Sequence, residues 1–255
     1  MKNLSNRRAF LKNISLLGVG TLLGNSIFAQ NISNELIDNT LLEILGIQKP
    51  FLCQENNSEL RVKASQAFHD MKYDALRDGI AIYCSSSYRS FNLQNGIWKR
   101  KFNKLKATEK DESLIIKTIT EYSSIPGTSR HHWGTDIDMI DALGCPEEDA
   151  LLSENYSDCG PYAYLGYWLK NNAHKYGYHI TYTSNDFRPG FRFEPWHYSF
   201  KEDSIPFLKL ILEADLYCAL SELPILGKNN FTQEFIDNYK AQYILGINPD
   251  LIPIY

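Results

Sequence analysis

The amino-acid sequence predicts an α+β fold in which helices flank a small antiparallel or mixed sheet. Segments with helical spacing and short apolar or alternating segments follow one another in the order helix, strand, helix, helix, strand, helix, strand, strand, helix. Short turns connect the later segments, and such connections favour antiparallel neighbours over the helical crossovers of a parallel sheet. With 44% hydrophobic and 22% charged residues, the 255-residue chain can bury a core of this kind.

The first half of the chain supplies the first predicted helices and strands. Apolar residues from Ala64 to Leu76 recur at helical spacing, and Gly79 is expected to end that helix. The run IAIYC at 80–84 is short and apolar, as expected of a buried strand, and TDIDMID at 135–141 alternates as a half-buried strand does. Two more helices are expected near 91–105 and at 114–123.

The second half is predicted to begin with a loop insertion, residues 142–160, which is rich in acidic residues. The helix after it should end at Gly177, because glycine is common just past a helix C-terminus. A strand that contains Pro195 is expected to be broken there, since proline cannot donate a hydrogen bond to a sheet. The remaining expected elements are a helix near 165–176, strands at 178–183 and 191–200, and helices near 205–220 and 231–244.

The N-terminus, residues 1–29, has the features of an export signal. A basic start is followed by a short apolar run and by Ala29, after which cleavage is expected. The segment NRRAFLK resembles a twin-arginine signal, although Asn6 takes the place of the usual Ser or Thr, and an ordinary secretory signal is the alternative. The apolar run is short for a membrane span and no cysteine follows it for a lipid anchor. We therefore expect a periplasmic or extracellular protein without a stable membrane anchor.

The rest of the chain divides into an N-terminal arm (30–60), a core domain (61–204) and a C-terminal helical extension (205–255). The net charge is −4, and because residues 1–29 carry four basic residues and no acidic one, the remainder carries −8. An acidic chain without a basic stripe is not expected to bind nucleic acid. In an exported protein, Cys145 and Cys159, which flank the insertion, form the predicted disulfide. The sequence leaves the oligomeric state open.

Unusual polar residues gather at the predicted strand ends, in the segments SSYRSFNLQ (86–94), SRHHWGTDID (129–138) and EPWHY (194–198). Histidines and a carboxylate can make a three-ligand zinc site with one open position. Arg89 could supply positive charge to a developing oxyanion, and Glu194 could act as a base. These residue types together are sufficient for metal-assisted hydrolysis.

Spacing alone does not select the ligands. His131 and His132 are adjacent, so on an extended segment they would point in opposite directions and one of them would reach the site. Asp136 and Asp138 share a strand face, so periodicity does not choose between them. The helical HExxH pattern of many zinc peptidases is absent from the sequence. Structural histidines held by hydrogen bonds remain an alternative at this point.

The three segments also resemble a known family, and they occur in its order. SRHHWGTDID is similar to the SxHxxGxxxD motif of the VanY-like zinc D-alanyl-D-alanine carboxypeptidases, a branch of the LAS (M15) peptidases. EPWH resembles the family's motif in which a glutamate precedes a Trp-His pair, and SSYRSFNLQ is similar to its S-G-Y-R-S-xxx-Q segment. The resemblance spans roughly the central half of the chain and implies that residues 61–204 form a LAS-type zinc peptidase core with the metal site at the sheet.

The resemblance also implies a role for each matching residue. The zinc ligands would be His131, Asp138 and His197, and Glu194 would be the catalytic base. Arg89 would be a further catalytic residue that binds the substrate's carbonyl or carboxylate. Ser129, Gln94 and Tyr88 would belong to the substrate pocket, although core packing is an alternative for Tyr88. The implied cofactor is Zn²⁺, and the implied partners are peptidoglycan stem peptides.

Two departures from the family pattern are visible. Ser87 replaces the usual glycine before Tyr-Arg, and Asp136 stands where a small residue is common. Asp136 could support a ligand or recognise a substrate amine. The implied activity is removal of a terminal D-amino acid. An L,D-carboxypeptidase, a D,D-dipeptidase and a non-catalytic zinc-containing cell-wall binding protein are the alternatives, as are structural histidines in an unrelated exported domain.

Overall fold

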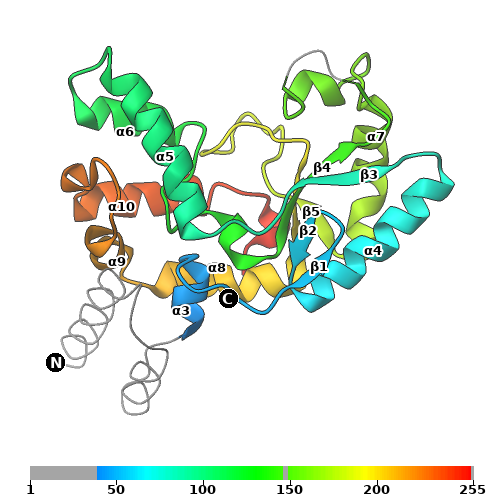
Figure 1. Cartoon of the computed structure of the whole chain (residues 1–255), viewed down its shortest axis with the longest axis horizontal. Helices are drawn as coiled ribbons and strands as arrows, with labels where there is room; N and C mark the ends of the chain where they lie inside the picture. The colour runs from blue at the N-terminus through cyan, green and yellow to red at the C-terminus, as the bar shows by residue number, and fades with distance from the viewer. Residues whose placement is uncertain (1–38, 146–148, 254–255) are drawn as a thin grey trace.

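A four-stranded antiparallel sheet lies at the centre of the protein, which a computed structural model describes over residues 39–145 and 149–253 (Figure 1). The strand order is β3-β4-β6-β5, and each neighbouring pair is antiparallel. This sheet and the helices around it confirm the predicted α+β class. The sheet strands are β3 (Ile82–Ser86), β4 (Asp136–Asp141), β5 (Tyr178–Ile180) and β6 (His197–Phe200), and β1 (Cys53–Glu55) pairs with β2 (Ser58–Leu60) in a separate hairpin.

Helices flank the sheet on two sides. In Figure 1, α5, α6, α9 and α10 lie on one side of the sheet, and α4 and α7 lie on the other. Within the described ranges, no helix is long and apolar enough to cross a membrane. The α-helices are α3 (Asn39–Ile44), α4 (Val62–Arg77), α5 (Phe91–Lys106), α6 (Glu112–Thr120), α7 (Ala163–Asn172), α8 (Lys201–Glu213), α9 (Leu216–Glu222) and α10 (Gln233–Tyr239).

Two hydrophobic cores correspond to these two groups of helices. One core packs the sheet against α4 and α7, through buried residues such as Ile137 and Leu165. The other joins α5 and α6 to the C-terminal helices, through residues such as Trp98 and Leu220. The Trp98 indole N–H also donates to the carbonyl of Leu226 at 2.9 Å. The C-terminal residues therefore hold α5 in place through apolar packing and this hydrogen bond.

Strand β4 divides its side chains between a core face and a polar face. Ile137 and Met139 are fully buried in the core between the sheet and its helices. Asp136 and Asp138 alternate with them and point to the other face, as period-two alternation requires. In the register with β6, Asp138 lies opposite His197 and Asp136 lies opposite Ser199. The predicted shared face of the two aspartates is therefore present.

Several predicted elements have different boundaries in the structure. The strand expected at 191–200 begins only at His197, after Pro195, and the one expected at 178–183 ends at Ile180. The single helix expected near 205–220 is two helices, because Asp215 caps the start of the second with its side chain. The predicted insertion contains a short 3-10 helix, Ser153–Tyr156.

Two further predictions concern the termini and the cysteines. The expected export signal lies outside the described residues. The expected disulfide is wrong for this structure: Cys145 and Cys159 are both free thiols. Both side chains are exposed to solvent.

Candidate functional site

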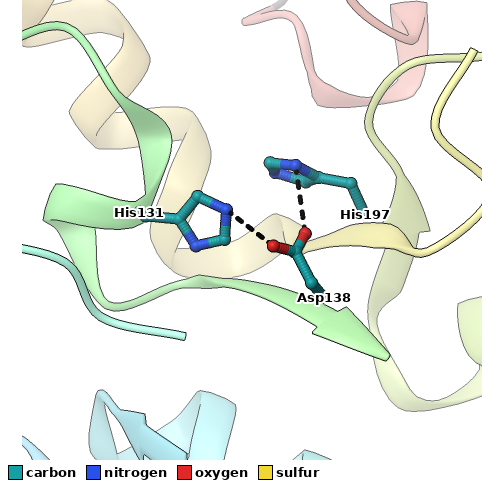
Figure 2. A group of neighbouring side chains, drawn as sticks. All are labelled: His131, Asp138 and His197. Carbon is teal, nitrogen blue, oxygen red and sulfur yellow. Dashed lines mark ion pairs between the residues drawn. The ribbon is translucent and has the colours of Figure 1, made fainter. Parts of the chain in front are cut away.

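Three side chains that could hold a metal ion converge at the polar face of the sheet. His131 comes from a 3-10 helix (Arg130–Trp133), Asp138 from β4 and His197 from the start of β6. Their possible ligand atoms all lie within 4.8 Å of one another, and all three residues are buried. Figure 2 shows both imidazoles pointing toward the carboxylate. Opposite register positions on β4 and β6 bring Asp138 and His197 together.

Hydrogen bonds leave one nitrogen of each imidazole facing this cluster. Nδ1 of His131 lies 2.7 Å from the carbonyl oxygen of Ser87 and must donate to it, so Nε2 faces Asp138 at 3.4 Å. Nε2 of His197 lies 3.0 Å from a carboxylate oxygen of Asp136, so Nδ1 faces Asp138 at 3.4 Å. Each ring is thus oriented by the bond on its far side, as is common for metal-binding histidines.

The donor set fits a zinc ion. Two imidazoles and one carboxylate make a three-ligand set. Oδ1 of Asp138 is buried and accepts no hydrogen bond from any described residue, and Nδ1 of His197, at 3.4 Å from it, is a second donor atom that a metal ion there would share. Burial would raise the pKa of Asp138, but the nearby imidazole of His131 lowers it, so this group is a carboxylate.

The pKa of His197 reflects the same concentration of carboxylates. Burial lowers this pKa, but hydrogen bonds to Asp136 and Glu194 and the charge of Asp138 raise it to about 10. A metal ion at Nδ1 would replace the proton that these groups otherwise hold there.

Asp136 lies at the centre of a buried hydrogen-bond network. One carboxylate oxygen accepts from Nε of Arg130 at 2.8 Å as well as from His197. The other oxygen accepts from the hydroxyl groups of Thr135 and Ser199, both at 2.8 Å. Burial would raise the pKa of Asp136, but the charge of Arg130 and the hydrogen bond from His197 lower it. Asp136 is therefore a fully buried anion, and each of its carboxylate oxygens accepts two hydrogen bonds.

His132 lies outside the cluster and supports the chain segment that carries Arg89. Because residues 130–133 form a 3-10 helix, the expected extended segment is wrong, although the two rings still reach different surroundings. Nδ1 of His132 donates to the carbonyl of Arg89, and Nε2 accepts from the N–H of Gly127. Burial lowers the pKa of His132 to about 3, so it is neutral. A side chain at Gly46 would clash with this ring.

Arg89 is held by neutral partners. Its guanidinium donates to the side-chain oxygens of Gln94 at 2.9 Å and Ser86 at 3.0 Å. Burial lowers the pKa of Arg89, while the charges of Asp138 and Glu194 oppose that effect. The guanidinium remains charged and makes no ion pair with a described residue, so it can bind an anion in the cleft.

Glu194 lies beside the metal-binding cluster. Its carboxylate is 3.1 Å from Nδ1 of His197, and its side chain is 23% exposed, in contrast to the buried ligands. The backbone N–H of Glu194 donates to the carbonyl of Tyr182, whose ring packs edge-on against His197 with centroids 5.0 Å apart. These contacts place a solvent-accessible carboxylate next to the cluster.

A cleft of about 710 Å³ opens over these residues. The cluster residues, Glu194, Arg89, Gln94 and Ser129 line it, and we call these residues its floor and the other lining residues its walls. Helix α5 contributes Arg100 and Lys101 to one wall, and residues 149 and 151–154 of the insertion contribute to another. The hydroxyl of Ser153 donates to the carbonyl of Phe193, so the insertion is tied to the segment that carries Glu194. The insertion is therefore part of the cleft.

The structure brings most of the predicted site residues together but not all of them. Tyr88 does not line the cleft: its ring lies beneath Lys49, and its buried hydroxyl has no partner among the described residues. The cleft also contains Lys101, Arg192 and Tyr182, which the sequence did not single out. Arg130 was overlooked as well. Arg130 precedes the histidines in the segment SRHHWGTDID, which also contains Asp136, and this proximity in the sequence could have pointed to it.

Comparisons with known proteins place these residues in a family. The family described as VanY, D-alanyl-D-alanine carboxypeptidase, matches residues 57–203. YodJ of Bacillus subtilis (strain 168), whose name assigns it to the carboxypeptidases, is 27% identical over 139 residues, which are 54% of this chain and 45% of that protein. A D-alanyl-D-alanine carboxypeptidase of Enterococcus faecium is 22% identical over 197 residues, 76% of this chain and 49% of that protein.

The chain thus spans about half the length of the curated relatives it matches. A solved structure of VanYB in complex with D-alanine-D-alanine is similar with a TM-score of 0.49 and 20% identity, and the match covers 66% of this chain and 91% of that chain. The family match covers more than half of the sequence, from β2 to α8, and includes every residue of the metal-binding cluster. The chain belongs to the VanY D-alanyl-D-alanine carboxypeptidase family.

Proposed function

We propose that this protein is an exported zinc-dependent peptidase that removes the terminal D-amino acid from peptidoglycan stem peptides. The observation that carries the proposal is the convergence of His131, Asp138 and His197 beside Glu194 at the floor of an open cleft. Membership of a carboxypeptidase family supports the same reaction class and a location outside the cytoplasm. The E. faecium relative is itself named for D-alanyl-D-alanine carboxypeptidase activity.

His131, Asp138 and His197 would hold the zinc through Nε2, the carboxylate and Nδ1. Zinc, when bound in such a site, makes water acidic enough to attack near neutral pH and polarises the carbonyl. Glu194 would accept the proton of the attacking water and deliver it to the leaving amine. Its position 3.1 Å from His197 and its access to solvent suit that role.

Arg89 would bind negative charge on the substrate. Its fork of N–H donors suits the terminal carboxylate or the oxyanion that develops on the scissile carbonyl. Hydrogen bonds to Gln94 and Ser86 hold the guanidinium in place, so the side chain of Arg89 needs little reorganisation to bind the substrate's anionic group. Ser129 and Gln94 would form the adjoining pocket wall.

The test is hydrolysis of defined stem peptides by the purified, zinc-loaded chain. We expect release of free D-alanine from a pentapeptide that ends in D-Ala-D-Ala, and no release by the Glu194→Ala variant. A tetrapeptide and a free D-Ala-D-Ala dipeptide report L,D-carboxypeptidase and D,D-dipeptidase activity in the same assay. If the zinc-loaded chain and the Glu194→Ala variant are both inert on all three, the protein is not this enzyme, and binding of peptidoglycan without turnover would show a cell-wall binding protein instead.

A further inference from the structure

Asp136 takes no part in the proposed reaction, yet both oxygens of its carboxylate accept hydrogen bonds from buried neighbours. It is 0% exposed, and it contacts His197 on the side of the imidazole that faces away from Asp138. A buried carboxylate is costly to desolvate, so its presence behind a histidine of the cluster requires a physical reason.

We propose that Asp136 is a positioning residue that fixes His197 with its proton on Nε2 and its Nδ1 directed at the metal. The geometry assigns this role because a carboxylate oxygen can only accept, so the nitrogen 3.0 Å away must donate. Nδ1, which lies 3.1 Å from the carboxylate of Glu194 and 3.4 Å from Asp138, is then the nitrogen that would exchange its proton for a metal ion. This inference rests on the zinc site of the proposed function.

Arg130 completes the arrangement. Its Nε donates to the same oxygen of Asp136 that His197 contacts, and it is itself only 6% exposed. The second nitrogen, Nη2, donates to the hydroxyl oxygen of Ser199 at 2.6 Å, and that hydroxyl donates in turn to the other carboxylate oxygen of Asp136. Arg130 thus balances the charge of Asp136 and holds its carboxylate in place, so the position of the oxygen that accepts from His197 is fixed as well.

A role in recognition of a substrate amine fits the contacts less well. Both oxygens of Asp136 are already bonded, to Arg130, His197, Thr135 and Ser199. Asp136 does not line the cleft, whereas Asp138 and His197 do. The side chain therefore acts through His197 and does not touch a ligand in the cleft.

The Asp136→Asn variant isolates the charge. An amide oxygen can still accept from Arg130 and His197, while the NH₂ group can donate to the hydroxyl oxygens of Thr135 and Ser199. The double variant Arg130→Met/Asp136→Ala removes the ion pair as a unit, so no buried charge is left unpaired. Asp141→Asn is the matched control, because it makes the same chemical change on β4 at a half-exposed position away from the cleft.

The experiment measures zinc affinity by chelator competition on the full chain. We expect about 10- to 100-fold weaker binding for the double variant, which loses the partner of His197, and a smaller loss for Asp136→Asn, whose amide oxygen can still accept from His197 but carries no charge. We expect Asp141→Asn to bind zinc within about twofold of the wild type, because its side chain reaches no metal ligand. Thermal unfolding of each metal-free variant checks that the fold is retained.

Two spectroscopic readouts separate positioning from a general structural role. In the zinc-loaded wild type, long-range ¹H–¹⁵N correlation spectra should show His197 protonated at Nε2 with the metal at Nδ1. The visible spectrum of the cobalt-substituted protein should change in Asp136→Asn and in the double variant but not in Asp141→Asn. Metal bound through Nε2 of His197, or folded Asp136→Asn and double variants with wild-type zinc affinity and cobalt spectra, would overturn the inference.

The outcome is independent of turnover. A wild type that binds zinc but hydrolyses no peptide would contradict the proposed function and leave this inference standing. A wild type that binds no zinc would overturn both. Hydrolysis by the wild type with unchanged zinc binding in the folded Asp136 variants would overturn this inference alone.

Discussion

The floor of the cleft and its walls are built in different ways. The floor contains the metal-binding cluster, whose residues come from β4, the start of β6 and the 3-10 helix before β4 and are buried and fixed by strand register or hydrogen bonds. The walls come from residues 97, 100 and 101 of α5, from residues 149 and 151–154 and from residues 191–193, and they carry exposed side chains such as Arg100 and Arg192. We infer that the floor performs the chemistry of the proposed function and that the walls select its substrate.

The largest expected effect follows from removing a metal-binding side chain from the floor. Asp138→Ala should lower zinc content from about one per chain to well under one and reduce hydrolysis to background, because only two imidazoles remain. Elemental analysis after dialysis, together with the peptide assay, measures both effects. Addition of a chelator to the wild type should mimic the loss, and added zinc should restore activity to the wild type alone. Undiminished zinc content in folded Asp138→Ala would place the metal elsewhere.

A change at Glu194 should separate chemistry from metal binding within the floor. Glu194→Gln keeps the size of the side chain but cannot accept the proton of water, so we expect kcat to fall by about 10²- to 10⁴-fold. Zinc content should stay near that of the wild type, because Glu194 is not one of the clustered ligands. Steady-state kinetics and elemental analysis on the same sample give the comparison. A kcat within a few-fold of the wild type would remove Glu194 from the reaction.

Arg89 belongs to the floor but not to the metal-binding cluster, and its replacement should have an intermediate effect. Arg89→Gln removes the charge that neutral partners hold in the cleft, and we expect kcat/KM to fall by about 10²- to 10³-fold, as for loss of an oxyanion donor. Arg89→Lys should recover part of this loss through its charge but not its forked geometry. Equal activity of the lysine, glutamine and wild-type proteins would show that Arg89 serves packing only.

The smallest effect is expected at the wall. Lys101 lines the cleft, and its ammonium donates to the hydroxyl of Ser123 rather than to a carboxylate. If it attracts an acidic group of the stem peptide, Lys101→Met should raise KM by about two- to fivefold and leave kcat unchanged, the scale of a partly exposed charge pair. Lys99→Met on the exposed face of the same helix is the matched control. A selective fall in kcat for Lys101→Met would contradict the division between floor and walls.

The same division describes how much could be predicted from the sequence. The helices and most strands followed from periodicity, and the motifs identified the floor residues that the structure brings together. The walls could not be predicted in this way, because Lys101 and residues 149–154 meet only through the tertiary fold and no local pattern links them. Asp136 shows the limit most clearly: its position on the strand face was predictable, but its partner Ser199 depends on the register with β6 and its partner Arg130 on the 3-10 helix before β4.

The central claim is that His131, Asp138 and His197 bind one zinc ion at the floor. Crystallographic anomalous scattering at the zinc absorption edge tests it directly on the zinc-loaded chain. We expect one strong peak about 2.0 to 2.2 Å from Nε2 of His131, a carboxylate oxygen of Asp138 and Nδ1 of His197. A peak at other side chains, or none at this cluster in protein that contains stoichiometric zinc, would contradict the claim.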